Sequence, residues 1–144
     1  MTADLERLLP HRPPMVFVDD VERADEESCV ARWTVPGESP WVEDGRLLRA
    51  AFIEIAAQTA ALHAGLAGAE SGGPARRGHL GMVAYFRIHG DAVVGDVLRS
   101  SARRVAAFGL LSRIECRIER VADGAATPLA EGGLTVALEA PSAA

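Results

Sequence analysis

A single charged side chain interrupts a long apolar stretch in the first half of this chain. Between Arg49 and Glu70 only Glu54 carries a full charge at neutral pH, and the residues from 50 to 66 are mostly apolar. A helix that is apolar on nearly every side has to be enclosed by protein on nearly every side. A carboxylate held out of water in such a helix is costly unless it is paired or used. Glu54 is therefore a candidate for passing a proton to or from a substrate, and a hydrogen-bonded structural carboxylate is the alternative.

The bulk composition is that of one globular domain. The chain has 144 residues, of which 49% are hydrophobic and 24% charged, enough to bury a core without a second domain. The first residues include acids in place of the basic start of a secretion signal, and no apolar run approaches the roughly 20 residues that span a bilayer. Cys29 and Cys116 are far apart in the sequence, so we expect two reduced, buried thiols and no metal site. The sequence predicts a single domain over residues 1–144 in the cytoplasm.

The charge balance limits the choice of partners. A net charge of −5 disfavours nucleic acid as the main partner, because phosphate backbones bind concentrated positive charge. All 15 basic residues are arginine, and two tight pairs stand out, Arg76 with Arg77 and Arg103 with Arg104. Each pair is either a local cationic patch on an acidic body or ordinary solvated surface charge.

The order of the elements indicates one long helix among antiparallel strands. Asp4 to Leu9 is typical of a single helical turn that Pro10 ends, and the apolar stretch predicts a helix from about Leu47 to Leu66. The strands expected from alternation and from the turn residues between them are Met15–Val18, Cys29–Val35, Val83–Ile88, Val97–Val105, Leu110–Ile118 and Leu134–Leu138. The first two of these are predicted to form a hairpin across the polar turn 25–28.

The strand over Leu110–Ile118 shows the alternation most clearly. Ile114, Cys116 and Ile118 fall on one face, and the residues between them are charged. A sheet with one wet face has to cover something with the other, and the long helix is the only large apolar element available. The sequence therefore predicts an α+β domain in which an antiparallel sheet of about six strands wraps around one central helix.

Several segments resemble a known family, the 3-hydroxyacyl-[acyl carrier protein] dehydratases of the hotdog fold. Leu-Leu-Pro-His-Arg-Pro-Pro-Met-Val-Phe-Val-Asp at 8–19 is similar to the opening segment of the family, and Ile-Glu-Ile-Ala-Ala-Gln at 53–58 is similar to its central-helix motif. Weaker likenesses follow in the same order at 80–82, 94–98 and 133–136. The nearest resemblance is to the divergent dehydratase-like subunits of aryl-polyene and related polyene pathways.

The resemblance implies dehydration of 3-hydroxyacyl-acyl carrier protein thioesters to trans-2-enoyl thioesters. The substrate is then carried on the phosphopantetheine of an acyl carrier protein, and no other cofactor is implied. Dehydration needs a base for the proton beside the thioester and an acid for the departing hydroxyl, and the resemblance makes Glu54 the acid. The housekeeping enzymes carry their catalytic base in a His-Phe-Pro element before the central helix, but the corresponding stretch 38–45 contains no histidine.

Further site residues are expected from the same resemblance and from the helix itself. The amide groups at the start of the helix, near Gly45 to Leu48, can polarise the thioester carbonyl. Gln58 belongs to the matched motif and is expected to bind substrate. His11 lies in the first matched segment and is a candidate for the missing base, and His79 could face the mouth of a substrate tunnel.

Three functions remain open on the sequence. The chain is an active dehydratase that uses Glu54, a non-catalytic hotdog subunit that supports a dehydratase partner, or an acyl thioesterase in which Glu54 activates water or attacks the thioester. The hotdog fold usually dimerises by joining sheet edges, so we expect a homodimer or a heterodimer with another hotdog dehydratase subunit. Carrier proteins are generally acidic. Arg76 and Arg77, or Arg103 and Arg104, are therefore expected near the tunnel entrance, where they would bind the carrier.

Overall fold

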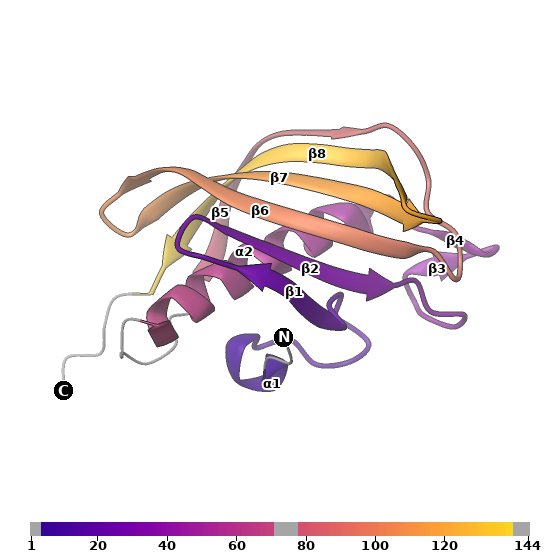
Figure 1. The fold of residues 1–144 in the computed structure, drawn as a ribbon, viewed down its shortest axis with the longest axis horizontal. Coiled ribbons are helices and arrows are strands. Elements are labelled where there is room, and N and C mark those ends of the chain that lie inside the picture. Colours follow the sequence, from indigo (N-terminus) through magenta and orange to yellow (C-terminus); the bar gives the residue numbers. More distant parts are fainter. Residues whose placement is uncertain (1–3, 71–77, 140–144) are drawn as a thin grey trace.

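A curved antiparallel sheet wraps a long helix in the computed structural model, which describes residues 4–70 and 78–139 (Figure 1). The helix α2 runs from Ala50 to Glu70 on the concave side of the sheet. The six strands of the sheet stand in the order β1-β2-β6-β7-β8-β5. Their bounds are β1 Asp20–Ala24, β2 Ser28–Thr34, β5 Gly78–Ile88, β6 Val97–Phe108, β7 Leu111–Ala122 and β8 Ala125–Leu138. The predicted α+β architecture, with one long helix and about six antiparallel strands, is confirmed.

The helix α2 packs its apolar sides into the concave face of the sheet. Phe52 and Ile55 belong to the main core together with Leu98, Ile118 and Leu134 of the sheet. Burying a side chain of this size contributes about 1.5–3 kcal/mol relative to leaving it exposed. One set of helix positions is only half-buried: Ile53, Glu54, Ala57, Ala61 and Ala64. Because these positions recur every three or four residues, they form one stripe of α2 that the sheet leaves open.

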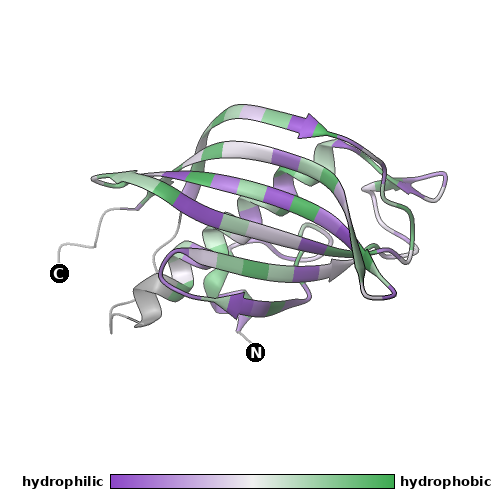
Figure 2. Cartoon of the chain, turned by 45° about the horizontal axis from the view of Figure 1, so that its top comes forward, coloured by the Kyte–Doolittle hydropathy of each residue, from purple (hydrophilic) through white to green (hydrophobic). Residues whose placement is uncertain are grey.

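The two faces of the sheet alternate as the sequence predicts. In β7, Ile114, Cys116 and Ile118 are buried, and the charged residues between them are half-buried or exposed. Figure 2 shows hydrophobic and hydrophilic residues alternating along the strands of the sheet. The register carries this alternation across the sheet, since Ile118 stands opposite Ser100 of β6 and Ala130 of β8, which are also buried. The inner face of the sheet is thereby matched to α2, and the outer face is left to the charged residues.

The prediction of a strand over Met15–Val18 is wrong. The first strand is β1, five residues long, and it pairs with β2 across the expected turn. The backbone of the segment 15–18 hydrogen-bonds to the side-chain amide of Gln58 and not to a neighbouring strand. Its Oε1 accepts a hydrogen bond from the Phe17 backbone N–H at 2.8 Å, and its Nε2 donates to the Met15 carbonyl at 2.7 Å. Gln58 is far from this segment in the sequence, so the alternation of residues within the segment cannot reveal that Gln58 is the hydrogen-bond partner.

A small hairpin precedes α2 and includes Leu47, where the sequence predicts the start of the helix. Its strands are β3 Val42–Glu43 and β4 Arg46–Leu47. Asp44 and Gly45, with φ of 53° and 75°, form the two-residue turn between them. The Leu47 backbone N–H donates to the Ala92 carbonyl at 2.9 Å, which ties the hairpin to the segment before β6. The helix consequently begins at Ala50, and it ends four residues later than predicted, at 70.

Two consecutive glycines in β8 leave room for two aromatic residues of the neighbouring strand β5. Gly132 stands opposite Phe86, and Gly133 stands opposite Tyr85. A Cβ atom at Gly132 would lie 2.3 Å from Cδ2 of Phe86 and 2.8 Å from the carbonyl oxygen of Tyr85. The missing side chain therefore allows the Phe86 ring to cross β8 and reach the core.

We expect Gly132→Ala to lower the free energy of unfolding by about 2 kcal/mol or more, because a clash with a backbone oxygen cannot be relieved by a rotamer change. Gly37→Ala is the matched control, since a Cβ atom there meets only Val94, at 4.0 Å. Urea denaturation of both variants measures the difference. Equal midpoints would contradict the close approach of β5 to β8 at this position.

The two cysteine thiols are expected to be inert in the folded protein. Burial, and to a lesser extent the charge of Asp25, raises the pKa of Cys29 to about 12. Burial and the charge of Glu115 likewise raise the pKa of Cys116 to about 12. Both thiols stay protonated at about pH 8, so an aromatic disulfide reagent should react with them only after denaturation. Rapid labelling of either thiol in the native protein would show that the core is more open than described.

Candidate active site

Glu54 lies in the second turn of α2, on the stripe that the sheet leaves open. Its neighbours on this stripe, Ile53 and Ala57, are apolar and half-buried. Glu54 forms no ion pair with residues 4–70 or 78–139. The expected burial is met only in part, because the chain's own sheet does not cover this side of the helix. The carboxylate is thus half-buried beside apolar side chains, without an ion pair to the described part of the chain.

An ion cluster holds the start of α2. Asp91 accepts a hydrogen bond from Arg49 Nε at 3.0 Å, and its second oxygen lies 3.7 Å from Nη1 of Arg46. The hydrogen bond from Arg49 and the charges of both arginines lower the pKa of Asp91. A cavity of about 480 Å³ opens between these residues, Leu48 and the β3–β4 hairpin. The first residue of α2 lies about 6 Å from Glu54 along the helix axis, at 1.5 Å per residue.

One of the two backbone sites expected to polarise a thioester adjoins the helix start. The Leu48 carbonyl accepts a hydrogen bond from the Ala51 N–H at 3.0 Å, so Leu48 immediately precedes the first turn. Gly45 lies in the turn of the β3–β4 hairpin, where its carbonyl accepts from the Val94 N–H at 3.0 Å. Gly45 therefore lies in the hairpin and not in the first turn of α2. Substrate binding by either residue stays a prediction.

Gln58 and Trp41 hold the two loops that flank the start of α2. Gln58 is 1% exposed and uses both ends of its amide on the backbone of Met15 and Phe17. The Trp41 Nε1–H donates to Sδ of Met15 at 3.2 Å, and its ring meets the Phe17 ring edge-on, with centroids 5.3 Å apart. Sequence reasoning misses Trp41, although a tryptophan in the stretch where the family histidine is absent is a usable signal. A substrate-binding role for Gln58 stays a prediction.

The two histidines of the first half of the chain have different surroundings. His11 is half-buried, and its Nδ1 is buried with no hydrogen-bond partner among the described residues. No hydrogen bond in the described structure joins His11 to Glu54, so its role as a base stays a prediction. His63 is buried further along α2, where its Nε2 lies 3.0 Å from the Glu26 carbonyl oxygen.

The remaining predicted site residues lie at the far end of the molecule or outside the described residues. His79 is exposed in β5, and its Nε2 lies 2.9 Å from a carboxylate oxygen of Glu139. Arg76–Arg77 is outside the described residues. Arg103 and Arg104 are consecutive in β6, so their side chains leave opposite faces of the strand. They do not form one patch on one face of the sheet, and a place for either pair at a tunnel entrance stays a prediction.

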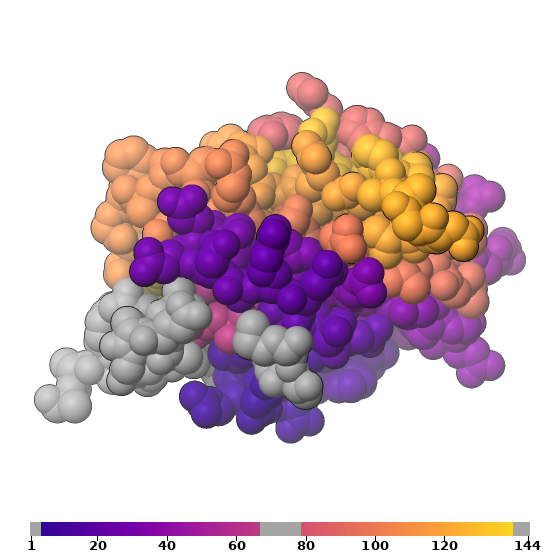
Figure 3. All heavy atoms as spheres, viewed as in Figure 1, coloured from indigo at the N-terminus to yellow at the C-terminus, as the bar shows by residue number. Residues whose placement is uncertain are grey.

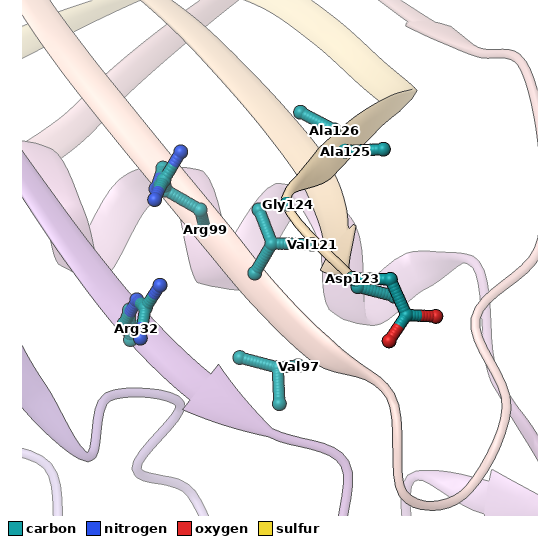
Figure 4. Close-up of a pocket in the computed structure, with 9 residues that line it drawn as sticks. Arg32, Val97, Arg99, Val121, Asp123, Gly124, Ala125 and Ala126 are labelled. Carbon is teal, nitrogen blue, oxygen red and sulfur yellow. The ribbon is translucent and has the colours of Figure 1, made fainter.

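A separate hollow of about 280 Å³ lies on the outer face of the sheet (Figure 4). Arg32 of β2 and Arg99 of β6 line it, together with Val97 and Val121. The Nε atoms of both arginines donate to the same carboxylate oxygen of Glu22, at 2.9 and 3.1 Å. Because the sheet separates this hollow from α2, it is not part of the site around Glu54.

Two further functions receive no support from the described part of the chain. No group of three or more His, Cys, Asp or Glu side chains within 4–70 and 78–139 is placed to hold a metal ion. No helix of the described residues is long and apolar enough to cross a membrane. The candidate site consists of Glu54, the start of α2 and the loops that Gln58 and Trp41 hold.

Solved structures share this fold. A chain of the dehydratase heterocomplex ApeI:P from Xenorhabdus doucetiae is 23% identical, with 97% of this chain and 93% of that chain covered and a TM-score of 0.85. A hypothetical thioesterase with coenzyme A from Streptococcus pneumoniae TIGR4 is 13% identical, with 83% and 84% covered and a TM-score of 0.67. The E. coli PaaI protein from the phenylacetic acid degradation operon is 14% identical, with 82% and 81% covered and a TM-score of 0.64. No curated protein matches the chain. At these identities, the likenesses show the fold alone.

The sequence itself matches a protein family over nearly its whole length. The family model ApeP-like, described as ApeP dehydratase, matches residues 3–143. The match includes both of the more specific segments, 8–19 and 53–58, and confirms the dehydratase-like family suspected from them. The chain therefore belongs to the ApeP-like dehydratase family.

Proposed function

We propose that this chain is a hotdog subunit of a dehydratase that converts 3-hydroxyacyl carrier-protein thioesters into trans-2-enoyl thioesters. The observation that carries the proposal is the position of Glu54 on the open stripe of α2, in a chain of the ApeP-like dehydratase family. A carboxylate that its own domain leaves half-covered, in apolar surroundings, is suited to act on a ligand or across an interface. The carrier protein, its phosphopantetheine arm and the acyl chain are parts of the proposal.

Glu54 acts as the acid in the proposed reaction. A base takes the proton from the carbon next to the thioester carbonyl, and the electron pair of that C–H bond forms the new double bond. The C–O bond at the neighbouring carbon breaks, and the hydroxyl leaves as water with the proton from Glu54. The positive end of the α2 dipole stabilises the negative charge that develops on the carbonyl oxygen.

The chain's own segment before α2 offers no histidine as the base. Residues 38–45 contain none, and in the structure they form the loop and hairpin that Trp41 holds in place. His63, on the same helix as Glu54, is buried and hydrogen-bonded to a backbone carbonyl. A second subunit that covers the open stripe of α2 can supply the base, because acid and base then meet across the interface. We infer that the site is completed in this way.

The edge strand β5 offers a surface for such a subunit. It stands at the end of the sheet and pairs only with β8 among the described strands. Leu80, Met82 and Tyr85 of β5 are 41%, 54% and 37% exposed. An edge strand of 11 residues with apolar side chains is a template for pairing with another chain. We infer a dimer joined at β5, either between two copies of this chain or with another hotdog dehydratase subunit, and the heterocomplex from which the similar ApeI:P chain comes supports the second form.

Glu54→Gln is expected to keep the fold and lower turnover by about a hundredfold or more, the usual scale for losing general acid catalysis. Turnover is measured as formation of enoyl carrier protein by the assembled protein. Glu43→Gln is the matched control, because Glu43 is an exposed carboxylate in the nearby hairpin. Normal turnover in Glu54→Gln would show that this chain is a non-catalytic subunit.

The thioesterase alternative has one observation in its favour, the shared fold with the thioesterase from Streptococcus pneumoniae. It makes a different product in the same assay. Hydrolysis leaves a carrier protein with a free thiol, whereas dehydration leaves the thioester intact and removes one water. Family membership favours the dehydratase, because it rests on the sequence as well as on the fold.

Met82→Asp is expected to dissociate the dimer, because a charge on the edge strand would be buried without a partner at the interface. Val93→Asp is the matched control, since Val93 is 45% exposed away from β5. Light scattering on the purified protein, and on the complex if a second subunit co-purifies, gives the mass of the assembly. An unchanged mass for Met82→Asp would exclude β5 as the joining edge.

A further inference from the structure

The outer face of β7 carries a row of charges whose sign alternates. Arg113, Glu115, Arg117 and Glu119 lie two residues apart on this face, because the residues between them point into the core. None of the four forms an ion pair with residues 4–70 or 78–139. The order of the signs is inverted when the strand is read in the opposite direction. A second copy of β7 that lies antiparallel against this face therefore sets each charge against its opposite.

The point of inversion is Cys116. Arg113 and Glu119 lie three residues from it on either side, and the two charges between them lie one residue from it. A two-fold axis that crosses β7 at this point, parallel to the sheet and perpendicular to the strand, places Arg113 opposite Glu119 of the other copy. In the same way, it places Glu115 opposite Arg117. Packed sheets lie about 10 Å apart, a distance that facing arginine and glutamate side chains together span.

The two ends of the same face are apolar and differ in shape. At one end, Phe108 of β6 and Leu111 of β7 stand opposite each other and are 76% and 48% exposed. This end of the β6–β7 hairpin lies at the left of Figure 1 and at the same margin of the molecular surface in Figure 3. At the other end, Val97 and Val121 stand opposite each other and line the hollow of Figure 4. One end therefore carries protruding side chains, and the other end carries a hollow.

The axis at Cys116 brings the protruding end of one copy to the hollow of the other. Leu111 and Val121 lie five residues from Cys116 on either side, so the axis places them opposite each other. Phe108 and Val97 stand beside them on β6 and meet in the same way. The axis that pairs the charges therefore also pairs the apolar ends, and it covers the exposed Phe108 ring.

The lining of the hollow suits an aromatic ring. Arg32 and Arg99 lie in it beside the two valines, and both donate to one carboxylate oxygen of Glu22. A guanidinium group attracts the face of an aromatic ring, most strongly where water is excluded. In the hollow, Phe108 therefore gains a cation–π contact as well as an apolar contact.

The balance of charge on this face favours a second copy over a partner of one sign. Glu119 stands opposite Arg99 of β6, and Arg117 stands opposite Glu131 of β8. A uniformly acidic or basic surface would meet as much repulsion as attraction here, whereas a second copy presents the matching order of charges. Because β6 and β7 stand in the middle of the six strands, they lie at the centre of the convex face, where a second copy makes contact (Figure 1).

We propose that the outer face of β6 and β7 is an interface between two copies of this chain, related by a two-fold axis at Cys116. In it, the charges of β7 pair, and Phe108 and Leu111 of each copy occupy the hollow of the other. The strand β8 separates β7 from the edge strand β5, so the β5 edge stays free for a further subunit. The interface lies outside the Glu54 site and does not depend on its chemistry. Together with a joint at β5, it makes an assembly of four chains.

Charge reversal tests the pairing of β7 with its copy. Glu119→Arg sets like charges against each other twice, so association through this face should weaken by at least about tenfold. Arg113→Glu should have the same effect, and the two substitutions together should restore association. In one chain the two positions are about 20 Å apart, at 3.3 Å per residue, so such a recovery requires contact between copies. Light scattering over a dilution series, on the protein with any subunit that co-purifies, measures the mass.

The apolar ends are tested in the same assay. Phe108→Ser with Leu111→Ser should also weaken association by at least about tenfold, because the hollow of the other copy is then left unfilled. Val93→Ser with Val94→Ser is the matched control, since both side chains are exposed away from this face. Glu38→Arg is the control for charge reversal, because Glu38 is exposed in the loop before β3. Urea midpoints verify that each variant is folded.

The outer face and the β5 edge are separated by combining substitutions. Met82→Asp, which acts on β5, should leave two chains associated through the outer face. Adding Glu119→Arg to that variant should give single chains. Glu119→Arg alone should leave the β5 joint intact and halve the mass of the parent assembly.

Cross-linking tests the register. In the variant that carries Leu111→Cys and Val121→Cys, a short bismaleimide should join two chains, because the two positions face each other across the interface. Within one chain, and between the same position of two copies, the separation is about 33 Å, so each single variant should stay uncrosslinked. The native thiols of Cys29 and Cys116 are buried and should not react.

Two sets of results would overturn the proposal. If neither Glu119→Arg nor the loss of Phe108 and Leu111 changes the mass, the chain does not associate through this face. If the mass falls with Glu119→Arg but does not recover with Arg113→Glu, or if Leu111→Cys alone is cross-linked, the copies meet in a different register and the axis at Cys116 is wrong.

Discussion

The burial of α2 is the constraint on which the rest of the structure depends. A helix with a single charge in its first 17 residues cannot stand in water, and the six-stranded sheet curves around it to exclude water from most of its sides. One sheet of this size leaves one stripe of the helix half-buried, and Glu54 lies on that stripe. One subunit therefore leaves both the edge strand β5 and one stripe of α2 uncovered. A second subunit that continues the sheet would pair with β5 and cover the stripe.

Two sets of contacts fix the start of α2, and they fix the position of the candidate site with it. Gln58 binds the backbone of the segment before β1, and Trp41 packs the loop before β3 onto that same segment. Arg49 and Asp91 join the helix start to the chain before β6. The stretch 38–45, which contains no histidine, is therefore ordered by a tryptophan and a short hairpin.

Local patterns were sufficient to predict the helix and most of the strands, but not the contacts between distant segments. The alternation of Ile114, Cys116 and Ile118 is a property of a short stretch, and the structure has the predicted alternation. Glu54 is the isolated charge of the helix in the sequence, but the structure leaves it half-buried, and its catalytic role stays a prediction. The segment Met15–Val18 has the composition of a strand, yet its backbone pairs with a side chain 40 residues away. The sequence also did not predict the open stripe of α2, since the exposure of that stripe depends on how far the sheet curves around the helix.

We propose that Glu54 acts in a dehydration site that a second hotdog subunit completes. The most direct measurement incubates a 3-hydroxyacyl carrier protein with the purified chain alone, and with the chain assembled with a hotdog dehydratase subunit, and follows the carrier-bound product by mass spectrometry. We expect loss of one water from the acyl group whenever the dimer is formed, and no release of free carrier thiol. A carrier protein that loses its whole acyl group would contradict it, as would full dehydration by a form of the chain that remains monomeric.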